Sequence, residues 1–181
     1  MTEKGAARFC IFGPHYGVYP LPRKEDIPKR LQEIAPNHEL LLGSTTREAA
    51  AIFSQKEKLS KLDKHLLTRG IVERFLGKNG RAIFNDPGEA FAKTYAEAGG
   101  KAYVYVFSWM EGKSPLGAIH ISDLLLIFGL GGAGGKPIAM GMSFDEVYQQ
   151  GIPMRKIWAD YAKTGQITRM KIDGMIEIRE L

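Results

Sequence analysis

His120 is the residue of this sequence whose side chain is best suited to acid–base chemistry, because an imidazole titrates near neutral pH. It lies in the segment SPLGAIHISDLLLIFG, where Gly117 and small neighbours leave the backbone free to turn tightly. Asp123, three residues later, has the chemistry either to orient the histidine or to cap the following turn. On these residues alone, a structural histidine is the commoner alternative to a catalytic one.

Glu48 is a second candidate and is equally ambiguous by itself. It follows an apolar strand-like run through Gly43-Ser44-Thr45-Thr46, and functional loops in α/β proteins lie at that end of a strand. The alternative interpretation is structural, since an acidic residue in the first turn of a helix is favoured by the helix dipole.

A serine nucleophile of the α/β-hydrolase kind is absent from this sequence. Such a serine sits in Gly-x-Ser-x-Gly, because the strained turn requires small residues on both sides. Of the seven serines, Ser114 and Ser143 have a glycine two residues before them but none two residues after, and the others lack one or both. Cys10 as an alternative nucleophile would need a different geometry, and we favour a buried free thiol there.

The glycine-rich segment from Gly129 to Gly134 satisfies the pattern Gly-x-Gly-x-x-Gly of dinucleotide sites. Such a site needs a helix to begin at the glycines, so that its N-terminus faces the pyrophosphate. Here Lys136-Pro137 follows instead, and helical signals return only at Ser143. We therefore predict a flexible loop and no cofactor. No cluster of His, Cys and carboxylate residues has zinc-like spacing, so no metal is expected.

The composition predicts one globular domain spanning residues 1–181, with 44% hydrophobic residues. The net charge of +5 comes from scattered basic residues, and Lys56 to Lys64 alternates with acidic and apolar residues like a solvated helix face. We therefore expect no nucleic-acid partner. We predict a cytoplasmic protein without membrane attachment, for three reasons. The sequence has a single cysteine and no secretory signal, and its apolar run at 124–130 is too short to span a membrane.

Two strands and the helices between them predict an α/β fold. The run Leu40-Leu41-Leu42 indicates a strand buried on both faces, and Ala102 to Trp109 gives the strongest strand signal. Two strands separated by helices form the crossover of a parallel sheet. Near the C-terminus, alternation over 167–172 and 175–178 predicts a hairpin with a type I′ turn at Asp173-Gly174.

Apolar spacing and capping signals predict the helices. The first runs from Ile27 to Ile34 with Asp26 as N-cap and Pro28 in the first turn, the second begins near Glu48, and the third spans Lys64 to Leu76 with Leu67, Ile71, Phe75 and Leu76 on one side. The fourth opens at Asp86-Pro87, carries Ala90, Phe91, Tyr95 and Ala98, and stops at Gly99-Gly100. A Ser143/Glu146 capping box begins a helix to Gln150, and Pro153 restarts another that carries Ile157, Trp158 and Tyr161 and ends at Gly165.

Four segments, taken in order, resemble the last third of type B carboxylesterases and cholinesterases. They are FGPHYGVYPLP at 12–22, ELLLGSTTREAAAIF at 39–53, AYVYVFSW with SPLGAIHISDLLLIFG at 102–129, and MRKIWADYAKTG at 154–165. In the first segment, His15-Tyr16-Gly17 replaces the family's usual aspartate-glycine pair. The resemblance implies the C-terminal portion of an α/β-hydrolase fold: the last two parallel strands with their crossover helices, then a C-terminal helix and a hairpin, in an incomplete sheet.

The same resemblance implies roles for Glu48 and His120 as the acid and the base of a serine triad. The histidine would take the proton of a serine hydroxyl and later give it to the leaving alcohol of a small ester, while the acid holds the correct tautomer. In α/β-hydrolases the nucleophile precedes the acid in the chain. Because no such serine is present, we expect no ester hydrolysis by these residues alone.

The missing part of the sheet also predicts a partner. The Leu40 strand would expose a hydrophobic edge, and such edges recruit other chains. We therefore expect either a homodimer or a complex with a separately encoded N-terminal esterase portion that supplies the serine, as in a split esterase. The alternative is a non-catalytic remnant that binds an apolar ligand or a protein.

Overall fold

The computed structural model describes residues 14–53, 66–111, 117–130, 135, 137–139 and 141–181. Its helices and strands, in chain order, are η1 Lys24–Asp26, α2 Ile27–Ile34, η2 Ala35–Asn37, β1 Glu39–Thr45, α3 Glu48–Phe53, α5 Leu66–Gly80, η3 Arg81–Asn85, α6 Asp86–Glu97, β2 Lys101–Phe107, α7 Ser122–Phe128, η5 Pro137–Ala139, α8 Phe144–Thr164, β3 Lys171–Ile172 and β4 Ile176–Glu180. Within these ranges the fold is mixed α/β.

The strands form a mixed sheet in the order β1-β2-β4-β3. β1 and β2 are parallel, with Leu40 opposite Ala102 and Ser44 opposite Val106, and their connection runs through α3, α5 and α6. This confirms the parallel crossover expected from the sequence. β4 pairs antiparallel with β2, and β1 occupies one edge of the sheet that the structure describes.

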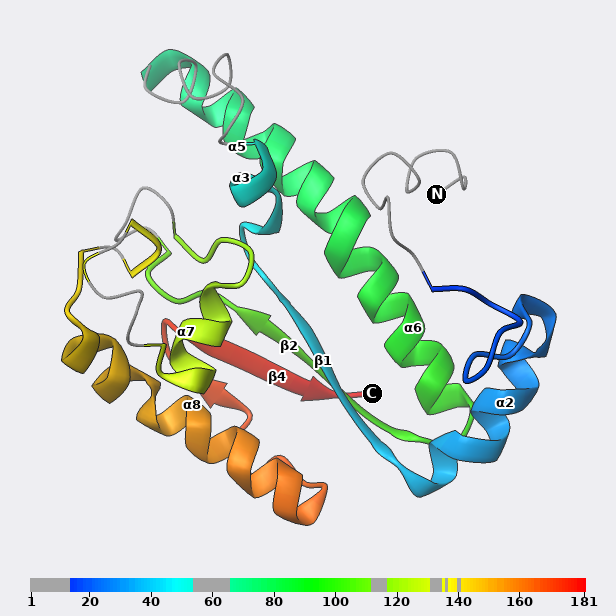
Figure 1. Ribbon diagram of the computed structural model, residues 1–181. Coiled ribbons are helices and arrows are strands. Elements are labelled where there is room, and N and C mark those ends of the chain that lie inside the picture. The colour runs from blue at the N-terminus through cyan, green and yellow to red at the C-terminus, as the bar shows by residue number, and fades with distance from the viewer. Residues whose placement is uncertain (1–13, 54–65, 112–116, 131–134, 136, 140) are drawn as a thin grey trace.

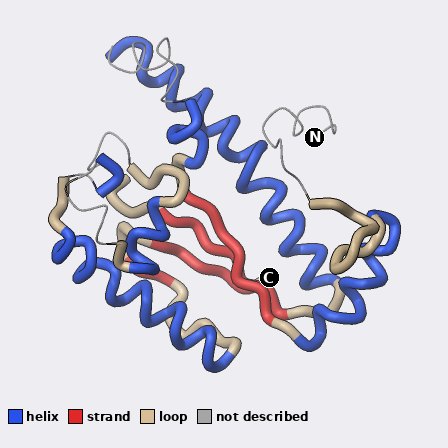
Figure 2. Tube along the Cα trace, viewed as in Figure 1, coloured by secondary structure: helices blue, strands red, loops and turns tan. Residues whose placement is uncertain are grey.

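The helices lie on both sides of the sheet, as Figures 1 and 2 show. On one side, α7 and α8 cover β2 and β4. Tyr103, Tyr105 and Phe107, which alternate along β2, pack with Leu126 of α7 and Met154 of α8. All five side chains are buried, so this side holds the largest apolar core of the described residues.

On the other side, α6 and α2 cover one end of β1 and β2. Leu31, Ala35, Ala92, Tyr95 and Ala102 form the buried part of this smaller core. Of the residues that the sequence places on α6, Tyr95 is buried, whereas Phe91 is 44% exposed. The α6 face that meets the sheet is set by the i, i+3 pair Ala92 and Tyr95.

The long helical rod of α5 and α6 in Figure 1 is continuous through η3, which is a π-helix. The apolar side predicted for α5 is wrong at two residues: Ile71 is 70% exposed and Phe75 is also exposed. Leu76, expected on the same side, is buried as predicted, and it packs with Val72 against Ala49 and Ala50 of α3. Two of the residues expected on one apolar side therefore face away, because α3 contacts the stripe one residue further along.

α8 is a single helix from Phe144 to Thr164, where two helices separated at Pro153 were expected. The capping box at Ser143 and Glu146 is confirmed. Gly151 lets α8 approach α7 closely, since a Cβ there would lie 2.5 Å from the Leu126 carbonyl oxygen. A proline inside a helix lowers its stability by about 3 kcal/mol. α8 nevertheless continues through Pro153, and it packs closely against α7 at the preceding turn.

Three local predictions differ from the structure: the Asp26 cap, the burial of β1 and the turn type of the C-terminal hairpin. Asp26 makes no side-chain cap to α2, although the helix bounds are as predicted, because the residue already belongs to the helical turn η1. β1 is only partly buried along most of its length rather than buried on both faces. The C-terminal hairpin forms, but Ile172 pairs with Ile176 across three residues and only Gly174 has a positive φ. A type I′ turn needs positive φ at both central residues, so that assignment is wrong.

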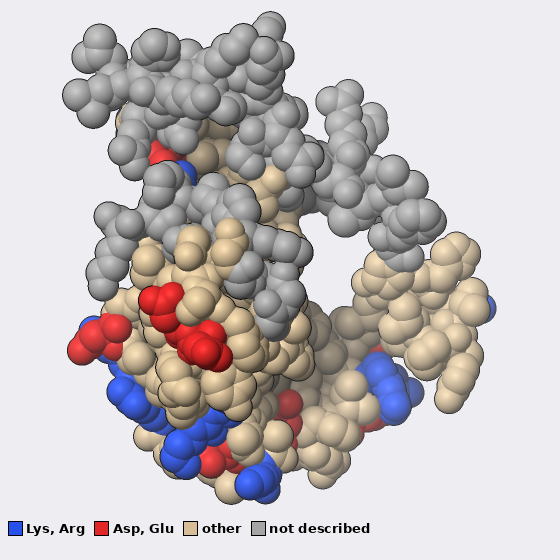
Figure 3. All heavy atoms as spheres, turned by 60° about the vertical axis from the view of Figure 1, so that its left-hand side comes forward, with Lys and Arg blue, Asp and Glu red and all other residues tan. Residues whose placement is uncertain are grey.

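Acidic and basic side chains lie near one another on the face that Figure 3 shows. Among the described residues, no helix is long and apolar enough to cross a membrane. Cys10, the Lys56 to Lys64 segment and residues 131–134 of the glycine-rich motif lie outside the described residues. The prediction of one domain over residues 1–181 stays a prediction.

Candidate active site

Glu48 is held by the turn that connects β1 to α3. Its Oε1 accepts a hydrogen bond of 2.6 Å from the backbone N–H of Thr45, the last residue of β1. The carboxylate is buried and lies at the first residue of α3, where the N-terminal end of the helix favours negative charge. One carboxylate oxygen is thus fixed by backbone, and the other is left to contact a side chain.

The segment before α7 carries His120 to the same place. Arg47 and Ile119 form an isolated parallel bridge, in which the Arg47 N–H donates to the Ala118 carbonyl. Ile121 then takes a φ of +65°, an uncommon conformation for a β-branched residue, before α7 begins. Backbone strain of this kind is frequent at functional sites. The bridge between Arg47 and Ile119 therefore places residue 48 next to residue 120.

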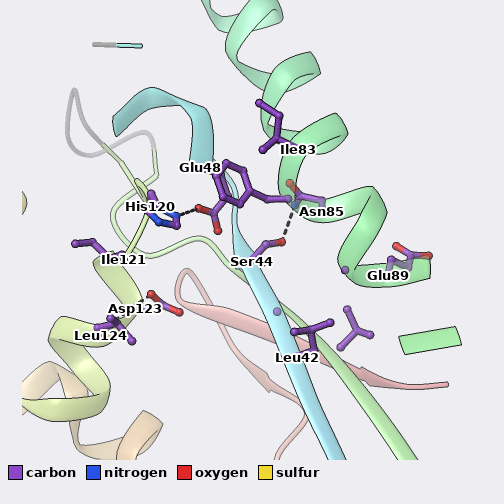
Figure 4. Close-up of a pocket in the computed structure, with 14 residues that line it drawn as sticks. Leu42, Ser44, Glu48, Ile83, Asn85, Glu89, His120, Ile121, Asp123 and Leu124 are labelled. Carbon is purple, nitrogen blue, oxygen red and sulfur yellow. Dashed lines mark hydrogen bonds and ion pairs between the residues drawn. The ribbon is translucent and has the colours of Figure 1, made fainter. Parts of the chain in front are cut away.

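The structure brings the two predicted site residues into direct contact. His120 Nδ1 lies 2.5 Å from Glu48 Oε2, across 72 residues of sequence (Figure 4). An ionised carboxylate can only accept, so the proton of this hydrogen bond belongs to Nδ1 and leaves Nε2 as the acceptor nitrogen. The Phe84 ring lies 5.1 Å from the imidazole. The His120 side chain is 43% exposed, which leaves part of the ring open.

Asp123 neither orients His120 nor forms an N-cap. Its Oδ2 accepts a hydrogen bond of 2.9 Å from the Tyr105 hydroxyl, and its Oδ1 accepts one from the Leu124 N–H. Burial of the Tyr105 hydroxyl, with the nearby carboxylates of Asp123 and Glu48, raises the pKa of Tyr105 well above its usual value. The tyrosine therefore stays a donor, and it anchors the start of α7 to the sheet.

A pocket of about 400 Å³ opens beside the pair. Its lining is mostly apolar, with Leu42 and Val104 from the sheet, Ile83 and Phe84 from η3, and Leu124 from α7. The lining residues labelled in Figure 4, including Asn85, surround one hollow. An acid–base pair at the mouth of an apolar pocket of this size is a suitable arrangement for an apolar ligand or acyl group.

Sequence reasoning missed the contribution of η3. Phe84 and Asn85 line the pocket, and Asn85 Nδ2 donates a hydrogen bond of 2.7 Å to Ser44 Oγ. A π-helical turn inside a helix often occurs at functional sites, but no periodicity in the sequence marks it. Ser44 therefore has an amide partner, and its side chain lines the pocket without a flanking Gly-x-Ser-x-Gly sequence.

Among the described residues, no group of three or more His, Cys, Asp and Glu side chains has the geometry of a metal site. The described residues place a carboxylate and an imidazole in contact beside a mostly apolar hollow.

Comparison with known proteins gives a distant hydrolase relative. No protein-family model matches the chain. The chain is 28% identical over 162 residues to a protein of Rhodococcus erythropolis described as the probable N-octanoylanthranilate hydrolase AqdA2; the match covers 87% of this chain and 35% of that protein. The chain thus spans about a third of the length of this relative. The match supports a hydrolase-like function, at a coarser level than the type B carboxylesterase family.

Proposed function

We propose that this chain contributes the acid and the base of a serine-hydrolase site that cleaves carboxylic esters, within an α/β-hydrolase fold of the type B carboxylesterase kind. The observation that carries the proposal is the hydrogen bond from His120 Nδ1 to Glu48 Oε2, with the other Glu48 oxygen held by the Thr45 N–H. This is the acid–base half of a catalytic triad. The distant hydrolase relative supports the same direction.

His120 acts as the general base in this proposal. Its Nε2 takes the proton from a serine hydroxyl as that oxygen attacks the ester carbonyl, and later returns it to the leaving alcohol. Glu48 keeps the ring in the tautomer that leaves Nε2 free and stabilises the imidazolium. The apolar lining around Leu42, Phe84 and Val104 receives the acyl part of the ester.

The nucleophile comes from a protein segment outside these 181 residues, because no serine here stands in Gly-x-Ser-x-Gly. The place for that segment is the outer edge of β1, which pairs with no other strand among the described residues. An unpaired strand edge presents a row of backbone donors and acceptors to a further strand. A second polypeptide that carries the serine, or a second copy of this chain, would cover that edge.

The test is hydrolysis of p-nitrophenyl butyrate by the chain alone and together with the polypeptide that bears the Gly-x-Ser-x-Gly serine. We expect turnover only by the combination. His120→Ala should lower kcat by about 10²- to 10⁴-fold, since a positioned general base contributes that much. Glu48→Gln should lower kcat too, because the neutral amide no longer stabilises the imidazolium.

Two matched variants serve as controls. Glu33→Gln changes an exposed carboxylate that is paired with Arg30 and does not line the pocket. His38→Ala removes an exposed histidine whose Nδ1 contacts only the Ile34 carbonyl among the described residues. Both should keep kcat. Equal activity of His120→Ala and His38→Ala in the active combination would reject the proposal.

A second candidate function is binding of an apolar ligand without catalysis. The observation that favours it is the apolar hollow itself, lined by Leu42, Ile83, Phe84, Val104 and Leu124. In that case the chain would bind a fatty-acyl probe, no combination with a serine-bearing polypeptide would turn over, and His120→Ala would leave binding intact.

A further inference from the structure

A second pocket, about 550 Å³ in volume, lies beside the acid–base pocket and has a basic lining. Its walls come from the end of β1, from α5 and η3, and from β2. The lining residues are Thr46, Arg74, Gly77, Lys78, Arg81, Asn85 and Val106. None of these residues is acidic, so every charged side chain in the lining that the structure describes is a cation.

The three cations share one side of the helical rod. Arg74, Lys78 and Arg81 are spaced i, i+4 and i+7, and like charges at such spacing repel one another. Elsewhere the helices balance their charges, with pairs such as Lys93–Glu89 and Lys156–Asp160. By contrast, none of these three cations has an ion-pair partner in the part of the chain that the structure describes. The nearby Glu73 is already bound by Arg47 Nη2 at 2.6 Å.

Two further lining residues supply polar and apolar contacts. Thr46 Oγ1 is buried and, within the described ranges, has no hydrogen-bond partner. A buried hydroxyl without a partner costs about 1–3 kcal/mol, which an acceptor atom of a ligand would recover. Val106, opposite Ser44 on the sheet, is 41% exposed and offers apolar surface.

Asn85 joins the two pockets. It lines both of them, and its amide donates to Ser44 Oγ between them. One molecule can therefore place an apolar part beside Leu42 and Val104 while an anionic end reaches the cations. Two arginines are suited to a carboxylate, because each guanidinium can bind both oxygens at once.

We infer that the Arg74–Lys78–Arg81 pocket binds the carboxylate of an organic acid with an apolar body. The pocket selects anionic substrates for the neighbouring acid–base pair; this second statement rests on the proposed function, whereas the binding itself does not. Thr46 donates its hydroxyl proton to the carboxylate, and Val106 contacts the apolar body.

The binding test uses 3-phenylpropionate and its uncharged counterpart 3-phenylpropan-1-ol, titrated against the full chain by NMR and calorimetry. Neither compound can be hydrolysed, so the result is independent of catalysis. The acid should bind more tightly than the alcohol, and its affinity should fall as salt is added. Replacing Arg74, Lys78 and Arg81 together by Gln should weaken binding of the acid by about ten- to hundredfold and leave the alcohol unchanged.

The matched control replaces Lys29, Lys163 and Arg169 by Gln, which lowers the net charge equally at other surfaces. It should bind the acid as the unmodified chain does. Equal weakening in both triple variants, equal affinity for acid and alcohol, or no binding of the acid would overturn the inference. Binding of the acid by the unmodified chain, with no ester cleavage by any combination with a serine-bearing polypeptide, would support the pocket and reject only the proposed function.

A KM comparison in the active combination then tests substrate selection. The Arg74/Lys78/Arg81 variant should raise KM for an O-acyl salicylate, an ester that carries a carboxylate, and keep KM for neutral p-nitrophenyl butyrate. Equal changes in KM for the two substrates would show that the cations do not select the anion.

Discussion

The two faces of β2 are covered very differently, although they alternate along the same seven residues. On one face Tyr103, Tyr105 and Phe107 are all buried beneath α7 and α8. On the other face exposure grows along the strand, from buried Ala102 through partly buried Val104 to exposed Val106. Both pockets open on this second face, where Val104 lines one and Val106 lines the other. One face therefore provides stability, and the other leaves room for ligands.

The largest effect expected from this contrast is at Phe107, which is fully buried. Phe107→Ala should lower the free energy of unfolding by about 3–5 kcal/mol, because it removes a large buried ring and leaves a cavity. Its neighbour provides the control, since Val106→Ala on the open face should change stability by less than about 0.5 kcal/mol. Urea unfolding followed by circular dichroism measures both. Similar losses would mean that the two faces do not differ.

Gly43 tests how tightly the covered face is packed. A Cβ at this position would lie 2.3 Å from carbons of the Tyr105 ring. That ring contacts Trp158 edge-on, with ring centroids 5.3 Å apart, and its hydroxyl is bound to Asp123. Gly43→Ala should therefore destabilise the protein by about 1–3 kcal/mol through overpacking.

The control for Gly43 is Gly70→Ala in α5, where an added Cβ meets nothing within 4 Å. It should stabilise the protein by about 0.5–1 kcal/mol, as alanine does in a helix interior. The Tm of Gly43→Ala should fall and that of Gly70→Ala should rise. A Tm shift of the same sign in both variants would refute this account of the packing.

Tyr105→Phe tests the contact between the covered face of β2 and α7, because the Tyr105 hydroxyl donates a hydrogen bond to Asp123 of α7. We expect a loss of about 1–3 kcal/mol at neutral pH, since the buried Asp123 loses a donor. The pKa of Tyr105 is raised above its usual 10.0 in the folded protein. A raised pKa stabilises the folded state below pH 10, and this contribution declines as the pH rises beyond 10 and the unfolded tyrosine ionises.

The alkaline decline in stability should consequently be smaller in Tyr105→Phe than in the unmodified protein. Tyr19→Phe, at a residue that is 96% exposed, should change neither the neutral stability nor the alkaline decline. Unfolding free energies measured from pH 8 to 11 decide this, and parallel pH profiles of all three proteins would contradict the assignment.

The smallest effect is expected on α5, at the residue that the periodicity misplaced. Ile71→Ala should alter the free energy of unfolding by less than about 0.5 kcal/mol, because the side chain is 70% exposed. Val72→Ala, one residue further along and buried against α3, should cost about 1–3 kcal/mol. The reverse order would restore the face predicted from the sequence.

The sequence predicts those elements whose signals are local. The capping box at Ser143 and the apolar, aromatic run from Ala102 predicted the start of α8 and the strand β2 correctly, because capping and strand preference depend on neighbouring residues. The buried face of α5 depends instead on which helix packs against it, and the continuity of α8 through Pro153 depends on its contact with α7. Neither is visible in a local pattern.

The residues of the candidate site could be predicted only in part from the sequence. Glu48 and His120 could be singled out from residue types and from a family resemblance, but their contact depends on the parallel pairing of two strands far apart in sequence. The part played by Phe84 and Asn85 depends on the π-helical turn η3, which presents them to the pocket. Nothing in the spacing around Asn85 distinguishes a π-helix from an ordinary helix.

The parallel pairing of β1 with β2 also determines when the site forms during folding. Leu40 and Ala102 must meet before residue 48 can reach residue 120, and closing so long a loop costs chain entropy that only the finished sheet returns. We therefore expect the acid–base contact to form late, after α6 and α8 have acquired helical structure. Hydrogen exchange at the Thr45 amide, which donates to Glu48, would then report the detachment of β1 as a single opening event.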